Sequence, residues 1–267
     1  MKENKILKRI LLALFGLIIV LPILILLIWG VSETWRFPDL LPTKLSLRGL
    51  YAAKNILRVV ISSIFISVSV GILSTIIGTM ASRSLVIEKL KYKKVFLFLN
   101  LLPLMVPATA FAMGIHITFI RIGLNDTVLG VIIVHLICSL PYSFNIMYDV
   151  TKSIGKKFED QAAVLGASQW QSFWQISFYV LVPGFATSFF ISFVVSFSQY
   201  FITLIIGGGN VITLSTIMIP FIQSGDRTIS GMYSILFLLT TMIVFSISDK
   251  ILGGKNARIK GDSCIIR

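Results

Sequence analysis

The stretch Glu159–Gly184, EDQAAVLGASQWQSFWQISFYVLVPG, interrupts a strongly apolar chain with a mixed, aromatic-rich segment. Apolar or small residues recur at spacings of three and four from Phe158 to Gly166, which places them on one face of a helix. Gly166 then breaks the pattern, because glycine permits a turn with positive φ. A second apolar face starts at Trp170. The pattern predicts two short helices at an angle, and it is equally compatible with a helix whose rings lie among lipid headgroups.

The composition of the chain indicates the solvent in which it folds. Of its 267 residues, 56% are hydrophobic and only 13% are charged, and the mean hydropathy is +0.92. That is too little polar surface for a water-soluble globule of this size. A net charge of +13 would suit nucleic acid, but the charges lie between apolar runs, as they do beside a membrane. We therefore expect a lipid bilayer as partner and no nucleic acid.

Six apolar stretches are long enough to cross a hydrocarbon core about 30 Å thick as helices. The sequence thus predicts an all-α polytopic protein with six transmembrane helices. The first stretch follows a basic leader and could be a signal peptide, but no small-residue cleavage site follows it, so we interpret it as a retained span. The predicted spans are Ile10–Trp29, Leu57–Ala81, Val95–Ile120, Val128–Tyr148, Phe178–Ile206 and Ile229–Ile247.

The distribution of Lys and Arg predicts the orientation. With the N-terminus inside, 17 of the 24 basic residues fall on the cytoplasmic side. Both termini are then cytoplasmic, and the opening stretch lies in a cytoplasmic loop at about 149–177. The predicted organisation is an N-terminal span and external segment (1–54), a transmembrane domain (55–250) and a basic cytoplasmic tail (251–267).

The loop resembles the Glu-Ala-Ala signature of inner-membrane permeases of binding-protein-dependent ABC importers. Aligned on Gly166, Asp160 takes the family's acidic position, and the Leu181–Gly184 run matches the usual proline-bearing continuation. Three positions depart from the pattern: Asp160 replaces Glu, Gln161 replaces Ala, and Tyr179 replaces a proline. In this family the loop docks into the ATPase subunit. The resemblance therefore implies coupling roles for Glu159, Asp160, Gln161, Ala162, Ala163, Gly166, Ala167 and Ser168.

The resemblance extends from about Asn55 to Ser248. The segment SFSQYFITLIIGGGNVITLSTIMI, from Ser196 to Ile219, is similar to importers of the polyamine, ferric iron, thiamine, phosphonate and sulfate group. It implies half of a solute pathway in a bacterial plasma membrane. The implied partners are a separate ATP-binding subunit, a second permease, identical or paralogous, and an external solute-binding protein. The solute would be small and polar or charged, such as a polyamine, thiamine, ferric iron or phosphonate.

The residues agree with a chain that does not catalyse. No phosphate-binding loop of the G-x-x-x-x-G-K-[ST] type occurs, so ATP would be hydrolysed by another subunit. No catalytic carboxylate pair, metal cluster or cofactor motif is apparent, and we expect none. The spans contain two histidines, His116 and His135, whose role the sequence does not decide. The alternatives are a stand-alone secondary carrier or channel, which needs no ATPase, and a structural assembly protein, which transports nothing.

Two stripes of small polar residues follow the predicted spans. The stripe of the second span predicts close approach of another helix; it comprises Ser63, Ser67, Gly71, Ser74, Gly78 and Ser82. The stripe of the fifth span is compatible with either packing or lining of the solute pathway; it comprises Ser188, Ser192, Ser196, Gln199 and Thr203. Pro103 and Pro107 in the third span predict a kink that acts as a hinge or curves the bundle.

Overall fold

The protein is described from a computed structural model, which places residues 3–33, 42, 44–46, 48–53, 56–88 and 90–253. Within these residues the chain is helical, and the β pairing consists of an isolated bridge between Ser32 and Leu45. The chain forms two compact units, residues 1–59 with 217–240 and residues 60–216 with 241–267. The predicted all-α fold is confirmed. Most of the predicted basic tail lies outside the described residues, and the division at 54 and 250 stays a prediction.

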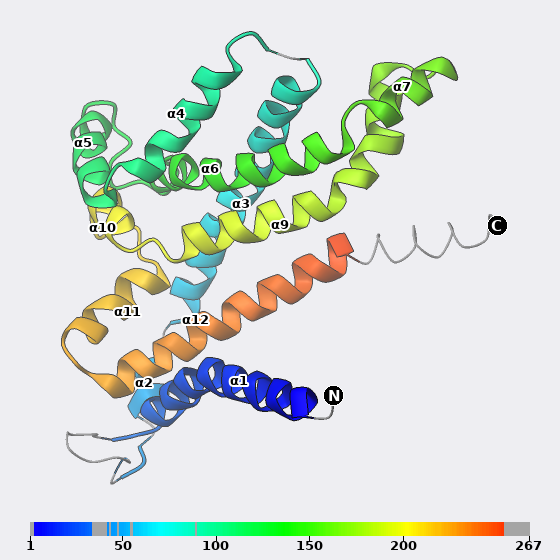
Figure 1. Cartoon of the computed structure of the whole chain (residues 1–267). Helices are drawn as coiled ribbons and strands as arrows, with labels where there is room; N and C mark the ends of the chain where they lie inside the picture. Colours follow the sequence, from blue (N-terminus) through cyan, green and yellow to red (C-terminus); the bar gives the residue numbers. More distant parts are fainter. Residues whose placement is uncertain are drawn as a thin grey trace. The chain divides into compact units, whose positions relative to one another are not determined.

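Among the residues that the structure describes, five helices are long and apolar enough to cross a membrane, and a bent pair makes a sixth candidate. Their labels are given in Figure 1. Apolar side chains on these helices are exposed, as Leu12 in α1 and Phe65 in α3 are. Extended apolar surface of this kind is typical of a membrane or protein interaction site. The long helices are α1 (Glu3–Gly30), α3 (Leu57–Val86), α6 (Val128–Ile154), α9 (Phe178–Phe197) and α12 (Arg227–Ser248). The bent pair is α4 (Lys93–Met105) and α5 (Ala108–Arg121).

The third predicted span is not one helix. Pro107 has no backbone N–H, and Val106 and Pro107 are extended, with ψ of 128° and 131°. The helix axis turns by 101° between α4 and α5. The prolines therefore break the span, which is a larger change than the predicted kink.

The fifth predicted span also ends earlier than expected. Its helix α9 stops at Phe197, and Phe201–Gly207 forms a separate short helix, α10. Two predicted stripe residues, Gln199 and Thr203, therefore lie beyond the end of the span. The remaining short helices are α2 (Arg48–Ala53), α7 (Lys157–Val164), α8 (Gln169–Ser172) and α11 (Leu214–Gln223), with π-helical turns η1 (Phe173–Ser177) and η2 (Asp249–Gly253).

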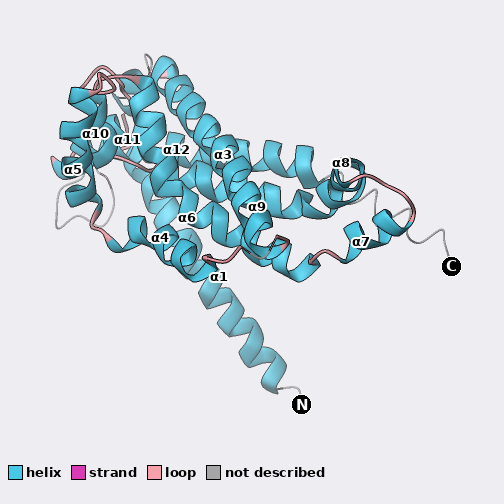
Figure 2. Ribbon diagram, turned by 90° about the horizontal axis from the view of Figure 1, so that it is seen from above, coloured by secondary structure: helices cyan, strands magenta, loops and turns pink. Residues whose placement is uncertain are grey.

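In the larger unit, α6 and α9 lie side by side, and α3 packs against both (Figures 1 and 2). Two glycines of the α3 stripe permit this approach. A Cβ at Gly78 would lie 2.6 Å from Ser143 Oγ of α6, and one at Gly71 would lie 2.9 Å from the Phe189 ring of α9. The predicted close-packing role of the second-span stripe is confirmed.

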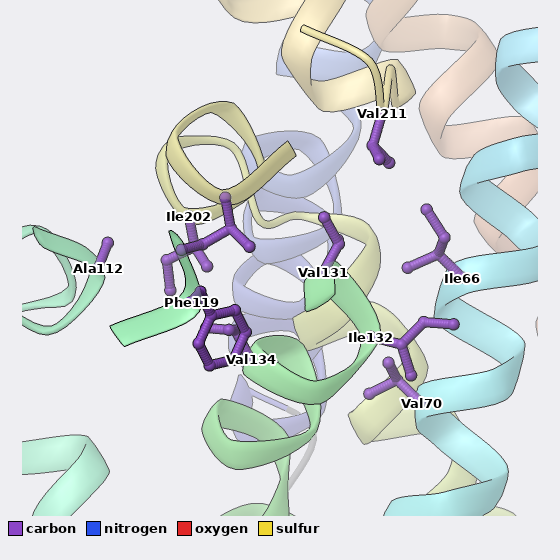
Figure 3. Packing of buried hydrophobic residues seen from close by; sticks show 10 residues of the cluster. Ile66, Val70, Ala112, Phe119, Val131, Ile132, Val134, Ile202 and Val211 are labelled. Atoms are coloured by element: carbon purple, nitrogen blue, oxygen red, sulfur yellow. The ribbon is translucent and has the colours of Figure 1, made fainter. Parts of the chain in front are cut away.

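An apolar core forms where α3, α5, α6 and α10 meet (Figure 3). Val131 and Val134 of α6 are fully buried there, with Ile66 of α3 and Ile202 of α10. Burying an aliphatic side chain of this size contributes about 1.5–3 kcal/mol. This core fixes the broken segment α10 against the long helices.

The smaller unit has its own contacts. Thr228 Oγ1 donates a hydrogen bond to the carbonyl oxygen of Ser32 over 2.8 Å. Arg48 pairs with Asp226, also over 2.8 Å. These contacts connect the end of α1 and the start of α2 to the start of α12.

Candidate functional site

The segment Lys157–Ser177 folds as two short helices and a π-helical turn at one end of α6 and α9 (Figure 2). Helix α7 ends at Val164, and Gly166 then takes a φ of +86°. Ser168 begins α8 with a capping box: its Oγ accepts from Gln171 N over 3.3 Å, and its own N donates to Gln171 Oε1 over 3.0 Å. The predicted pair of short helices with a glycine turn is confirmed.

The apolar face predicted for the first short helix is divided. Ala162 is buried, whereas Leu165 is 88% exposed, as is Val164. Leu165 follows the end of α7 and lies in the turn, with φ −83° and ψ 5°, so the helical spacing no longer applies to it. Ala162 thus packs inward, while Val164 and Leu165 form an exposed apolar tip.

The two acidic residues of α7 have different surroundings. The carboxylate of Glu159 is 15% exposed and pairs with Arg83 of α3, Nη2 to Oε1, over 2.7 Å. Ser177 Oγ donates to the same oxygen over 2.6 Å. Asp160 is 65% exposed and faces Lys156 at 3.9 Å. The structure therefore separates an inward carboxylate from an outward one.

The remaining predicted coupling residues lie around the turn. Gln161 and Ala163 are exposed on α7, Ala167 is half-buried, and Ser168 is exposed at the start of α8. Gly166 has open space around its Cα on the side where a Cβ would stand. Their coupling role stays a prediction.

A groove with a volume of about 1020 Å³ runs between α3 and the segment from α8 to α9. Its walls are mainly apolar, and Arg83 and Glu88 line it together with the indole rings of Trp170 and Trp174. Arg83 also lies with its guanidinium 4.6 Å from the centroid of the Phe173 ring. A cation over an aromatic face is favourable, so Arg83 has two partners at this position.

The fifth-span stripe is packed inside the chain. Ser188 Oγ lies 2.6 Å from Ser143 Oγ and 3.2 Å from Thr75 Oγ1. Ser188, Ser192 and Thr203 are fully buried, Ser196 is nearly so, and Gln199 is half-buried. The sequence left open whether this stripe packs against other helices or lines the solute pathway. The contacts within the chain show that it packs against other helices. A pathway-lining role stays a prediction.

His135 makes hydrogen bonds through both ring nitrogens and is 1% exposed. Its Nδ1 lies 2.9 Å from Ser196 Oγ, and its Nε2 lies 3.0 Å from Thr203 Oγ1. Thr203 donates its hydroxyl proton to the carbonyl oxygen of Gln199, so it accepts from His135 Nε2–H. Nδ1 is then the acceptor for Ser196. His135 therefore connects both sides of the break between α9 and α10.

Sequence reasoning missed Arg83 and Ser177. In the sequence Arg83 is one of the basic residues that follow the second predicted span, and Ser177 belongs to no motif. No spacing in the sequence links either to Glu159, since the pairs are 76 and 18 residues apart. The structure brings them together through the packing of α3 beside the loop.

Known proteins are similar in sequence to part of this chain. A putative ferric transport system permease protein of Haemophilus influenzae is 28% identical over 171 residues, which is 57% of this chain and 27% of that protein. A sulfate transport system permease protein of Escherichia coli is 24% identical over 131 residues, 48% of this chain and 47% of that protein. The chain thus matches about a quarter of the ferric relative's length and about half of the sulfate relative's.

The fold is shared with a solved structure. The crystal structure of a bacterial ABC transporter involved in the import of the acidic polysaccharide alginate contains a chain that matches with a TM-score of 0.70. The two are 18% identical, and the match covers 93% of this chain and 96% of that one.

The family assignment rests on the larger part of the sequence. Residues 74–255 match the family described as binding-protein-dependent transport system inner membrane component. The matched range includes the whole α7–α8 segment and all helices from α4 to α12. It confirms the predicted resemblance and the multi-pass location in the inner membrane. The chain belongs to the inner-membrane components of binding-protein-dependent transport systems.

Proposed function

We propose that this chain forms one half of a solute pathway and receives the energy for transport from a separate ATPase through α7 and α8. The observation that carries the proposal is the exposed apolar tip Val164–Leu165, held at a glycine turn between two short helices. An exposed apolar patch rimmed by polar residues is typical of a protein–protein interface. Asp160 lies exposed on the same short helix and would add a charge to that surface.

In the proposed mechanism, α7 and α8 transmit movements of the ATPase to the transmembrane helices. ATP binding and hydrolysis change the distance between two ATPase subunits, and each subunit carries the loop of one permease with it. The loop moves as a rigid body with the helices that it contacts, so the bundles alternate between inward-open and outward-open states. In this arrangement the loop is cytoplasmic, and so are both termini.

The other proposed partners follow from family membership. One chain offers one such loop, so a second permease, identical or paralogous, completes the pathway. An external solute-binding protein docks on the opposite side of the membrane, at the loops that include Gly207–Asn210. These glycines lie at the end of α10, where Gly208 and Gly209 have positive φ.

The proposed solute is a small polar or charged molecule. The names of the compared relatives refer to ferric iron and to sulfate, and the resemblance also includes polyamine, thiamine and phosphonate importers. The buried hydroxyls of the chain are neutral, so they favour neither a cation nor an anion. Selection therefore rests with the external binding protein.

The test is a pull-down from gently solubilised native membranes, with the bound proteins identified by mass spectrometry. We expect the wild-type chain to recover an ATP-binding subunit that has a phosphate loop. Gly166→Asp replaces a residue with φ of +86° and adds a charge to the turn, and Leu165→Ser removes one of the two apolar side chains of the tip. Both variants are expected to lose most of the bound ATPase while remaining inserted.

The matched control is Leu45→Ser. Leu45 is 76% exposed, like the tip, but it lies in the smaller unit and outside the residues that match the family. It is expected to recover the ATPase as the wild type does. Wild-type membranes that yield no ATPase, or equal recovery by Gly166→Asp, would favour a stand-alone carrier or channel.

A further inference from the structure

We propose that Glu159 and Arg83 are positioning residues that hold α7 against the transmembrane helices, and that Glu159 does not itself contact the ATPase. The inference rests on the proposed function of the loop. It changes the role that the family resemblance implies for Glu159. It also assigns a role to two residues, Arg83 and Ser177, that the sequence pattern did not identify.

Three elements meet at one carboxylate oxygen. Oε1 of Glu159 in α7 accepts from Nη2 of Arg83 in α3 at 2.7 Å. It also accepts from Oγ of Ser177, which lies where η1 passes into α9, at 2.6 Å. Charge-assisted hydrogen bonds of this length are the stronger kind. The Glu159 side chain therefore joins the loop to the second and the fifth spans at once.

Both ends of the π-helical turn η1 contact the Arg83–Glu159 pair. Its first residue, Phe173, lies under the guanidinium of Arg83, and its last residue, Ser177, reaches Glu159. Single π-helical turns inside α-helices are frequently found at functional sites. Arg83 thus contacts α7, which precedes the glycine turn, and η1, which follows α8 after that turn.

The burial of the pair distinguishes it from an ordinary surface ion pair. The side chains of Arg83 and Glu159 are 22% and 15% exposed. Partial removal from water strengthens the attraction between the charges and reduces screening by salt. The surroundings still admit some water, so the cost of desolvation stays below that of a fully buried pair.

The neighbouring Asp160 has the opposite character. Adjacent residues on a helix point in different directions, and the Asp160 side chain is 65% exposed with Lys156 at 3.9 Å. Asp160 is free to meet a partner, whereas Glu159 has its oxygen occupied from inside the chain. A force applied to the outer surface of α7 would pass through Glu159 to α3 and α9.

The experiment measures hydrogen–deuterium exchange of the α7 amides in the full-length chain in nanodiscs. Glu159→Ala removes both hydrogen bonds, and alanine preserves helix propensity, so a change reports on the lost contacts. We expect exchange over residues 157–164 to rise about tenfold in Glu159→Ala, because local opening becomes easier. The matched control Asp160→Ala, on the same helix, is expected to stay within about twofold of the wild type.

A charge exchange separates positioning from a general loss of structure. Arg83→Glu combined with Glu159→Arg restores the opposite charges, and we expect exchange to return to within about threefold of the wild type. Arg83→Glu alone brings two carboxylates together and is expected to raise exchange at least as much as Glu159→Ala. Should Glu159→Ala reduce insertion, Ser177→Ala tests the same oxygen with a smaller expected rise.

The same variants are then used to capture the ATPase from native membranes. Glu159→Ala is expected to lose capture and the charge-exchanged chain to regain it. Unchanged α7 exchange in Glu159→Ala, or an equal rise in Asp160→Ala, would overturn the positioning role. Absence of any ATPase from the wild-type capture would overturn the proposed function instead, and the exchange result would still decide the role of Glu159.

Discussion

The two ends of α9 are joined to their neighbours by polar contacts of different kinds. At the start of α9, Ser177 meets the charged pair Arg83–Glu159, whose side chains are partly exposed. At its end, Ser196 meets His135, which also bonds Thr203 across the break to α10, and these three are at most 2% exposed. The contacts at the first end involve charged groups. Those at the second end involve hydroxyl groups and a neutral imidazole, in which Nε2–H donates a hydrogen bond and Nδ1 accepts one.

The difference follows from access to water. A charge deep in a bilayer-spanning bundle is costly unless it is fully compensated, whereas neutral groups need only matched donors and acceptors. Neutral contacts suit the end that fixes a broken helix inside the core. Charged contacts suit the end where the loop meets the aqueous phase and where, in the proposed mechanism, force enters.

The largest effect on stability is expected from a substitution at the contact between α3 and α6, in the part of the bundle between the two ends of α9. Gly78→Leu would place a Cβ 2.6 Å from Ser143 Oγ, where α3 and α6 touch through backbone. Because both helices must separate, we expect a loss of about 3 kcal/mol or more, measured as a shift of the unfolding midpoint in detergent. Gly114→Leu is the control, because open space surrounds Gly114. Equal losses in the two variants would show that the contact is not specific.

The next largest effect tests the neutral end. His135→Leu leaves the hydroxyl of Ser196 without an acceptor in the core and Thr203 without a donor. Removing one partner of buried polar groups costs about 1–3 kcal/mol, so we expect a loss near the upper value. His116→Leu, in the half-buried part of α5, should change stability by less than about 0.5 kcal/mol. A larger loss from His116 than from His135 would contradict the packing role of His135.

Many of the contacts at the two ends of α9 could not be predicted from the sequence. Periodicity and the glycine predicted the α7–α8 pair, because helical spacing and positive φ are local properties. The small residues of α3 likewise predicted a close helix contact. The break after Phe197 and the partners of His135 depend on packing between segments 61 and 68 residues apart. Neither local propensity nor spacing contains that information, and the same holds for Arg83 and Glu159.

The charged end should respond to salt, unlike the neutral end. The interaction energy between Arg83 and Glu159, obtained from a double-mutant cycle on unfolding, is expected to be about 1 kcal/mol at low salt. It should decrease when the ionic strength rises to about 0.5 M, since the pair is still partly exposed. The cost of His135→Leu should stay constant over the same range. An Arg83–Glu159 interaction that is insensitive to salt would mean that water does not reach this end.

The smallest effect on stability is expected at the outer surface of the loop. Leu165 is 88% exposed, so Leu165→Ser removes almost no buried apolar area and should change the unfolding free energy by less than about 0.5 kcal/mol. Its effect on ATPase capture is nevertheless expected to be large. If Leu165→Ser keeps its stability but no longer captures the ATPase, the substitution weakens the interface with the ATPase and not the structure of the loop. If Leu165→Ser instead destabilises the chain as much as the loss of the Arg83–Glu159 pair does, the tip packs against the protein, and force would enter α7 at another surface.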